Sequence, residues 1–170
     1  MAAEQITLDR ERPDDFWEVE ALFDTCFAPG RTALSSYRLR DGVDPIAALC
    51  LTARDGGGVL AGAVRNWPVR IRKVPSILLG PVAVHPTRQG EGIAALLIWR
   101  SIEIARDSGW DRIMLVGDAP YYGRFGFEKL TGVHMPPPTN PDRVLGLALT
   151  DGAWDGVRGR VTRARTGKRG

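Results

Sequence analysis

The sequence has few of the residues that build disulfide frameworks and metal sites. Its 170 residues include 2 cysteines and 2 histidines, and these are too scattered to form a metal ligand set. Cys26 and Cys50 lie within apolar runs without C-x-x-C spacing, which favours reduced thiols in a cytoplasm. No apolar leader opens the chain, and no apolar run approaches the roughly 20 residues of a membrane span. We therefore expect a cytoplasmic protein without a metal or a membrane partner.

The net positive charge of the chain comes from its end. The formal net charge is +3, yet six of the 23 lysines and arginines lie in residues 158–170. Such a segment can hold phosphates electrostatically, but it lacks aromatic residues that would stack on bases. We predict that residues 158–170 form a basic, poorly ordered tail, and we expect no nucleic-acid partner. Residues 1–157 are enough for one domain with a real core.

Apolar periodicity predicts alternating strands and helices. Ile77–Val84 is apolar on both faces, as in a covered central strand, and Ile93–Asp107 has helical spacing. Arg112–Val116 is another short strand, so these three elements form a right-handed parallel crossover. The remaining predicted strands are 5–9, 47–53, 59–65, 69–72, 128–130 and 144–149, and the remaining helices are 16–27, 32–40 and 120–125. Asp55–Gly58 is interpreted as a hairpin turn. The pattern indicates an α/β domain with a mixed, mostly antiparallel sheet and helices on both faces.

Two glycines stand where the central strand leads into the long helix. Gly90 and Gly92 would leave backbone N–H groups open to an anion at the helix start, although glycines in a tight turn need no ligand. The spacing Gly90-x-Gly92-x-x-Ala95 also matches the dinucleotide-binding fingerprint. That alternative is weakened because residues 85–89 separate the strand from the first glycine, whereas the fingerprint begins directly after its strand.

Two blocks of sequence resemble landmarks of the GNAT N-acetyltransferase superfamily. Gln89-x-x-Gly92-x-Ala94 is similar to its acyl-CoA loop, and Pro120-Tyr121-Tyr122-Gly123-Arg124-Phe125-Gly126-Phe127 is similar to its Tyr-x-x-x-Gly-Phe block. The resemblance covers about residues 5–149. It implies that the central parallel strands splay apart to admit acetyl-CoA, and that the protein is an enzyme. The implied reaction is direct acetyl transfer to a primary amine in a ternary complex.

The resemblance also implies roles for individual residues. The backbone N–H of Val82 would stabilise the oxyanion, and Tyr122 would be the general acid that protonates the departing thiolate. The implied acetyl-CoA contacts are Val82, Val84, Arg88, Gln89, Gly90, Gly92, Ile93, Ala94 and Phe125. Without the family context, Tyr122 would be interpreted as an aromatic residue packed beside Phe125 and Phe127.

One departure leaves the general base open. Several family members carry a strand glutamate at the position that matches Leu78, which cannot accept a proton. Water relayed by a carbonyl group, or Asp118, could serve, while His85 and His134 are interpreted as surface residues. A non-catalytic acyl-CoA sensor is therefore an alternative to the enzyme.

The acceptor cannot be identified from the sequence. A small-molecule or peptide amine is expected, with contacts from residues 27–37, from the region of Trp67 and from the region of Pro136. The oligomeric state is also open, a homodimer included.

Overall fold

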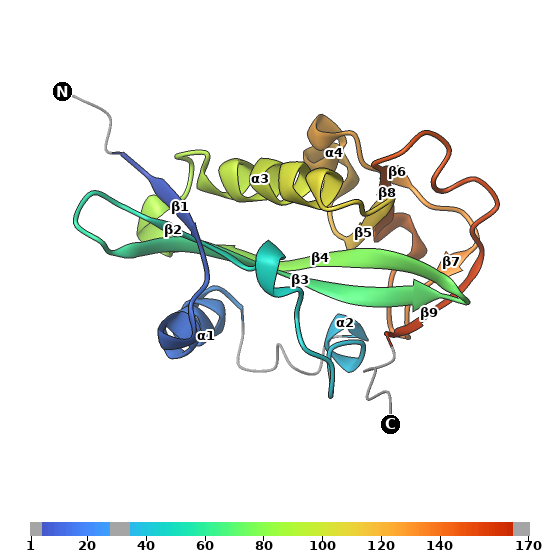
Figure 1. Cartoon of the computed structure of the whole chain (residues 1–170), viewed down its shortest axis with the longest axis horizontal. Coiled ribbons are helices and arrows are strands. Elements are labelled where there is room, and N and C mark those ends of the chain that lie inside the picture. Colours follow the sequence, from blue (N-terminus) through green and yellow to red (C-terminus); the bar gives the residue numbers. More distant parts are fainter. Residues whose placement is uncertain (1–4, 28–34, 165–170) are drawn as a thin grey trace.

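A long antiparallel hairpin of β3 (Leu60–Ile71) and β4 (Val74–Val84) runs through the middle of the sheet (Figure 1). The structure is a computed structural model that describes residues 5–27 and 35–164. The sheet order is β1-β2-β3-β4-β5-β8-β6, with β9 pairing both β3 and β7. The other strands are β1 (Thr7–Arg10), β2 (Leu51–Arg54), β5 (Arg112–Val116), β6 (Glu128–Lys129), β7 (Val133–His134), β8 (Val144–Ala148) and β9 (Gly159–Arg163).

The predicted α/β class with a mixed, mostly antiparallel sheet is confirmed. Within the described residues, the parallel pairs are β4 with β5 and β7 with β9, and the other pairs are antiparallel. The helix α3 (Ile93–Asp107) joins β4 to β5 and completes the predicted crossover. The bounds of α3 and β5 are those expected from the sequence.

Helices cover both faces of the sheet (Figure 1). On one face, α3 buries the stripe Ile93, Leu97, Ile98, Ile102 and Ala105 against the largest apolar cluster. On the other face, α1 (Phe16–Cys26) buries Val19, Leu22 and Phe23 against β3 and β4. This opposite face also carries the single turn α2 (Ser35–Arg38). Burial of these apolar stripes fixes the helices on the sheet, because isolated helices of such lengths are marginal in water.

The central strands separate in the middle of the sheet. Parallel pairing of β4 with β5 is limited to Ile77 with Ile113 and Leu78 with Met114, although β4 continues to Val84. The pairing of β4 with β3 shifts register between Val64 and Asn66, where Gly80 and Pro81 oppose the single residue Arg65. This is a β-bulge, a feature that bends a strand and increases its twist. The strands therefore part at the bulge after Leu78, rather than at the end of β4.

Two sequence predictions about chain segments are corrected. Residues 159–163 are not part of a poorly ordered tail, because they form β9 and bury Val161 between β3 and β7. Only Val161 of β9 is buried, so the segment lacks a strand-like apolar alternation that could have revealed it. Residues 47–49 form a 3-10 turn rather than the start of a strand. Residues 165–170 of the predicted tail lie outside the described residues.

The two cysteines form no disulfide with each other. Both Cys26 and Cys50 are free thiols, and burial raises the pKa of Cys50 to about 11. Within the described segments, no helix combines the length and the apolar character that crossing a membrane requires.

Candidate active site

The end of β4 exposes main-chain N–H and C=O groups to the gap between β4 and β5. His85 N donates to Ala61 O at 2.8 Å, directly beyond the register pairs Gly62 with Val84 and Ala63 with Ala83. Hydrogen-bonded and non-hydrogen-bonded pairs alternate along an antiparallel ladder. Val82 and Val84 are therefore at non-hydrogen-bonded positions, where N–H and C=O point away from β3. On that side of β4 lies the gap toward β5.

The carbonyl of Val84 supports this assignment of the ladder. It accepts a hydrogen bond from Cys26 Sγ at 3.2 Å and from Gln89 Nε2 at 2.9 Å, so it faces away from β3. The side chain of Gln89, predicted as a cofactor contact, thus closes the loop back onto the strand end. The side chain of Gln89 is therefore engaged by the protein, and its backbone groups remain available to a ligand.

The loop after β4 ends at a helix start with open backbone donors. Gly90 and Gly92 have φ of +85° and +80°, a region that side chains other than glycine rarely adopt. A Cβ added at either glycine would meet no protein atom within 4 Å, so the space beside both is open. The first backbone bond of α3 runs from Leu96 N to Gly92 O, which leaves the preceding N–H groups to bind an anion.

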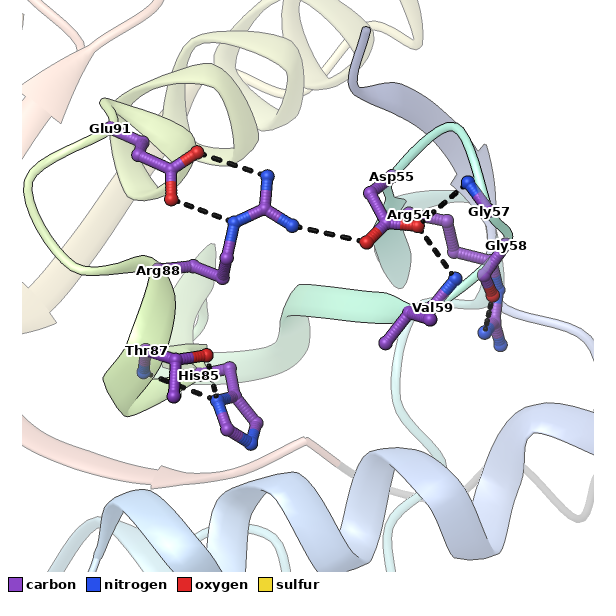
Figure 2. A network of polar contacts seen from close by, with 9 residues as sticks. All are labelled: Arg54, Asp55, Gly57, Gly58, Val59, His85, Thr87, Arg88 and Glu91. Carbon is purple, nitrogen blue, oxygen red and sulfur yellow. Dashed lines mark hydrogen bonds and ion pairs between the residues drawn. The ribbon is translucent and has the colours of Figure 1, made fainter. Parts of the chain in front are cut away.

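Arg88 holds this loop to a neighbouring hairpin (Figure 2). Its guanidinium makes a two-point contact with Glu91, at 2.7 and 3.0 Å, and an ion pair with Asp55 at 3.1 Å. Asp55 also accepts hydrogen bonds from Gly57 N and Val59 N in the turn between β2 and β3. The Val59 bond is the main cause that lowers the pKa of Asp55, and Arg88 lowers the pKa of Glu91. The structure thus shows Arg88 engaged by two carboxylates.

Tyr122 stands where the chain turns from β5 into α4 (Ala119–Tyr122). Its ring packs against Tyr121 and Phe127, with centroids 5.0 and 6.0 Å away. A Cβ at Gly117 would lie 2.5 Å from this ring, so the glycine after β5 makes room for it. Burial, with a smaller contribution from Tyr121, raises the pKa of Tyr122 to about 12. The phenol is therefore protonated at neutral pH.

A cavity of about 310 Å³ lies between the separated strands; we call it the splay cavity. It is lined by Phe27, Ser36, Tyr37, Leu79, Gly80, Pro81, Val82, Val116, Gly117, Asp118, Tyr122 and Arg143. The two predicted catalytic residues, Val82 and Tyr122, thus share one cavity although 40 residues separate them. The bulge in β4 and the turn after β5 bring them together.

Three other predicted acetyl-CoA contacts do not line the splay cavity. Ile93 is buried in the core below α3, and Ala94 packs against the same cluster, so both offer mainly backbone N–H groups to a ligand. Phe125 is 4% exposed and packs against Trp99 and Tyr121. Its side chain supports the aromatic cluster and is not among those that line the splay cavity.

The structure limits the choice of general base. Leu78 is 1% exposed within an apolar cluster. Asp118 lines the splay cavity, and its carboxylate accepts from Tyr121 N at 3.1 Å as the cap of α4. His85 bonds Thr87 within the loop, and His134 is exposed on β7. Neither histidine lines the splay cavity. Within the described residues, no group of three potential metal ligands was found.

Sequence analysis missed a second cavity, of about 440 Å³, between α1, α2 and β3. We call it the helix-side cavity; Phe16, Glu20, Tyr37, Arg38, Arg40, Asp41, Arg65, Trp67 and Pro81 line it. The expectation that acceptor contacts come from residues 27–37 and Trp67 includes Tyr37 and Trp67, while residues 28–34 lie outside the described residues. Arg40 was not predicted, because nothing in its local sequence distinguishes it from an exposed arginine.

Comparisons with known proteins agree with this geometry. A family model described as an acetyltransferase (GNAT) domain matches residues 8–130. The uncharacterized N-acetyltransferase YhbS of Escherichia coli strain K12 is 29% identical over 120 residues, which are 69% of this chain and 71% of that protein. The crystal structure of E. coli YhbS in complex with CoA superposes with a TM-score of 0.80 at 27% identity, covering 96% of this chain and 92% of that one.

A second solved structure gives the same result. The GNAT family acetyltransferase from Brucella melitensis, in complex with acetyl-CoA, has a TM-score of 0.70 at 27% identity, covering 94% of this chain and 96% of that one.

Proposed function

The chain belongs to the GNAT acetyltransferase family, and on that premise we propose that it transfers an acetyl group from acetyl-CoA directly to a primary amine in a ternary complex. The observation that carries the proposal is the shared cavity. There a run of β4 that is not paired with β5 offers outward backbone donors and faces the protonated Tyr122 of α4. A sheet that separates in this way gives a thioester access to both groups.

In this proposal, acetyl-CoA runs along the chain from the start of α3 back to Val82. The open N–H groups at the start of α3 and the space beside Gly90 and Gly92 suit the diphosphate. The outward N–H groups of Val84 and Val82 suit the pantetheine amide and the thioester oxygen. Arg88 has a positioning role in this proposal, since its guanidinium is engaged by Asp55 and Glu91.

In the reaction, acetyl-CoA supplies a thioester whose C–S bond breaks as the new C–N bond forms. The Val82 N–H donates to the thioester oxygen, where negative charge develops. The Tyr122 phenol donates a hydrogen bond to the departing sulfur. The neutral amine loses one proton to solvent as the C–N bond forms, and the departing thiolate takes up one proton from solvent.

The pKa of Tyr122 determines how its phenol assists the departure of the thiolate. A value of about 12 lies above the roughly 8.5 of an ordinary thiol. The phenol therefore keeps its proton firmly and contributes as a hydrogen-bond donor while charge develops on sulfur. Loss of such a donor lowers turnover without removing the cofactor site.

Tyr122→Phe tests the proposal against the alternative of a non-catalytic acyl-CoA sensor. CoA release is measured with a panel of amines, and acetyl-CoA affinity by calorimetry. We expect wild-type turnover with at least one amine and a decrease in kcat of at least about tenfold in the variant, with unchanged affinity. Acetyl-CoA binding without turnover of any amine would instead favour the sensor.

A further inference from the structure

The helix-side cavity lies between the splay cavity and an open groove at β9. It shares Tyr37 and Pro81 with the splay cavity. It shares Arg38 and Asp41 with the open groove, which we call the β9 groove. The β9 groove is lined by Arg38, Leu39, Asp41, Val161, Thr162 and Arg163. One elongated molecule can therefore extend from the splay cavity to β9, whereas a small amine is too short to reach the groove.

The register of the sheet gives the length of this path. Arg65 of β3 lies opposite the Gly80–Pro81 bulge. Further along β3, Val69 pairs with Arg163 of β9. Strand residues advance about 3.3 Å each, so the path from Arg65 to Val69 covers about 13 Å. An extended peptide advances by a similar amount per residue. With its N-terminal amine beside the bulge, such a peptide brings about its fifth residue to the β9 groove.

Two exposed arginines give the β9 groove its positive charge. Arg38 Nη1 donates to Pro137 O at 3.3 Å, and Arg163 Nη1 donates to Asp41 O at 3.1 Å. These main-chain carbonyls hold the guanidinium groups in place and leave their other N–H donors available. Within the described part of the chain, neither arginine forms an ion pair with a carboxylate. Both are therefore able to bind an acidic group.

The remaining charge of the β9 groove is a carboxylate. Among the lining residues, all of which the structure describes, Asp41 is the acidic one, and it is exposed. It offsets one of the two arginines, so the groove keeps an excess of positive charge. The groove therefore favours an acidic side chain over a basic one, and it disfavours acceptors that carry several ammonium groups.

Strand alternation distinguishes two arginines of the basic segment 158–170. Val161 is buried in the apolar cluster beneath α2. Side chains alternate between the two faces of a strand, so Arg163 lies on the same face as Val161, and Arg160 lies on the opposite face. Arg160 is exposed and is not among the residues that line the β9 groove. These two arginines have the same charge and differ in whether they face the groove.

We propose that the acceptor is a peptide whose amine enters the splay cavity and whose acidic side chain, at about the fifth residue, binds Arg38 and Arg163 in the β9 groove. This inference rests on the proposed acetyl transfer and names its substrate class. A carboxylate matches the fork of a guanidinium group, and the pair is charge-assisted. Because the contact lies about 13 Å along the sheet from the bulge, it acts on acceptor binding and not on the chemical step.

Matched peptides test the proposal with the full-length protein. CoA release is measured with short peptide amides that have a free N-terminus and contain either glutamate or glutamine as the fifth residue. We expect the glutamate peptide to have a KM about fivefold lower, with kcat unchanged, as for an exposed ion pair that contributes only to binding. Raising the salt concentration from about 0.05 M to about 0.5 M should remove most of this difference, because exposed charges are screened.

Arg163→Gln and Arg160→Gln are the matched variants. Arg163→Gln should reduce the glutamate preference to about twofold, and the further change Arg38→Gln should abolish it. Arg160→Gln removes the same charge outside the groove and should keep the preference. A preference that persists in the double variant, or that is lost equally in Arg160→Gln, would overturn the assignment to the β9 groove. Thermal unfolding and acetyl-CoA affinity show whether each variant is folded.

The outcomes separate this proposal from the proposed function. Equal kcat/KM for the two peptides, or small amines acetylated as efficiently as the glutamate peptide, would overturn the peptide proposal and leave acetyl transfer standing. No turnover of any amine by a protein that binds acetyl-CoA would overturn the proposed function.

A second measurement uses the wild-type protein alone and does not depend on a variant that folds. The same two peptides with an acetylated N-terminus carry no reactive amine. The acetylated glutamate peptide should inhibit competitively with the acceptor peptide, and at least about threefold more strongly than the acetylated glutamine peptide. Equal inhibition by both, or by neither, would contradict binding of an acidic residue.

Discussion

The two sides of the proposed active site are built in opposite ways. The donor side, residues 82–95, is one continuous stretch of chain that offers backbone N–H groups. The acceptor side, the helix-side cavity, combines side chains from α1, α2 and β3 that are far apart in sequence. A site made of main chain depends on strand register and on glycine, whereas a site made of side chains depends on which residues the fold brings together.

This difference predicts where substitutions act. On the donor side, a change matters when it alters a backbone donor or its φ angle, and most side-chain changes should be tolerated. On the acceptor side, the choice of substrate should depend on individual side chains, because the helix-side cavity is lined by side chains from several elements. The experiments below test the donor half of this comparison, beginning with the largest expected effect.

Removal of the Val82 N–H should have the largest effect. Replacing Val82 by its α-hydroxy acid puts an ester oxygen in place of the N–H and keeps the side chain. Loss of one oxyanion donor typically lowers kcat by about 10²–10³-fold, and we expect that range with acetyl-CoA affinity nearly unchanged. The steady-state rate of CoA release at saturating substrate measures the effect.

The neighbouring residue provides the matched control. The same ester at Ala83 removes an N–H at a hydrogen-bonded position of the β3–β4 ladder. It should lower the free energy of unfolding by about 1 kcal/mol and leave kcat near the wild-type value. Equal loss of kcat at both positions would contradict the alternation of donors derived for β4.

Gly92→Ala should weaken acetyl-CoA binding at least about tenfold, which corresponds to about 1.4 kcal/mol. Alanine is strained at a φ of +80°, and its methyl group would occupy the open space beside the helix start. Gly109→Ala places the same residue at a φ of +84°, also in open space, at the other end of α3. Calorimetry should show weaker binding in Gly92→Ala alone, while thermal unfolding shows similar destabilisation in both.

The Arg88 contacts should have a smaller effect. Asp55→Asn keeps an oxygen for Gly57 N and Val59 N but turns an amide toward Arg88. The loop then loses the Arg88–Asp55 ion pair to the β2–β3 turn, while Gln89 still holds it to β4. We expect acetyl-CoA affinity to decrease by about three- to fivefold, within the range of a partly buried ion pair. Glu103→Gln breaks an exposed pair with Arg100 on α3 and should change nothing. An unaltered affinity in Asp55→Asn would show that the loop does not need the hairpin.

The sequence predicts the donor side of the site better than the acceptor side. The bounds of α3 and β5 and the glycine loop were predictable because strong apolar periodicity and glycine punctuation are local signals. The cavity containing Arg40 was not, because tertiary packing alone brings α2 beside the β4 bulge. The position of the splay was not predictable either, since it depends on the Gly80–Pro81 bulge and its register with Arg65. β9 carries one buried residue among arginines and gave no strand signal.

The effect that is smallest at neutral pH concerns the proton on Tyr122, because it changes stability only at alkaline pH. Its pKa is raised from about 10 to about 12 by burial, so between these pH values the folded protein keeps a proton that the unfolded chain has lost. The free energy of unfolding should therefore decrease as pH rises from about 10 to about 12. Absorbance titration should show a late ionisation step, above pH 10, that belongs to Tyr122. Tyr122→Phe should remove that late step and weaken the alkaline loss of stability, whereas Tyr121→Phe should leave the late step in place. A late step that survives Tyr122→Phe would mean that the buried phenol is another tyrosine, and the hydrogen-bond donor proposed for the departing sulfur would then have to be reassigned.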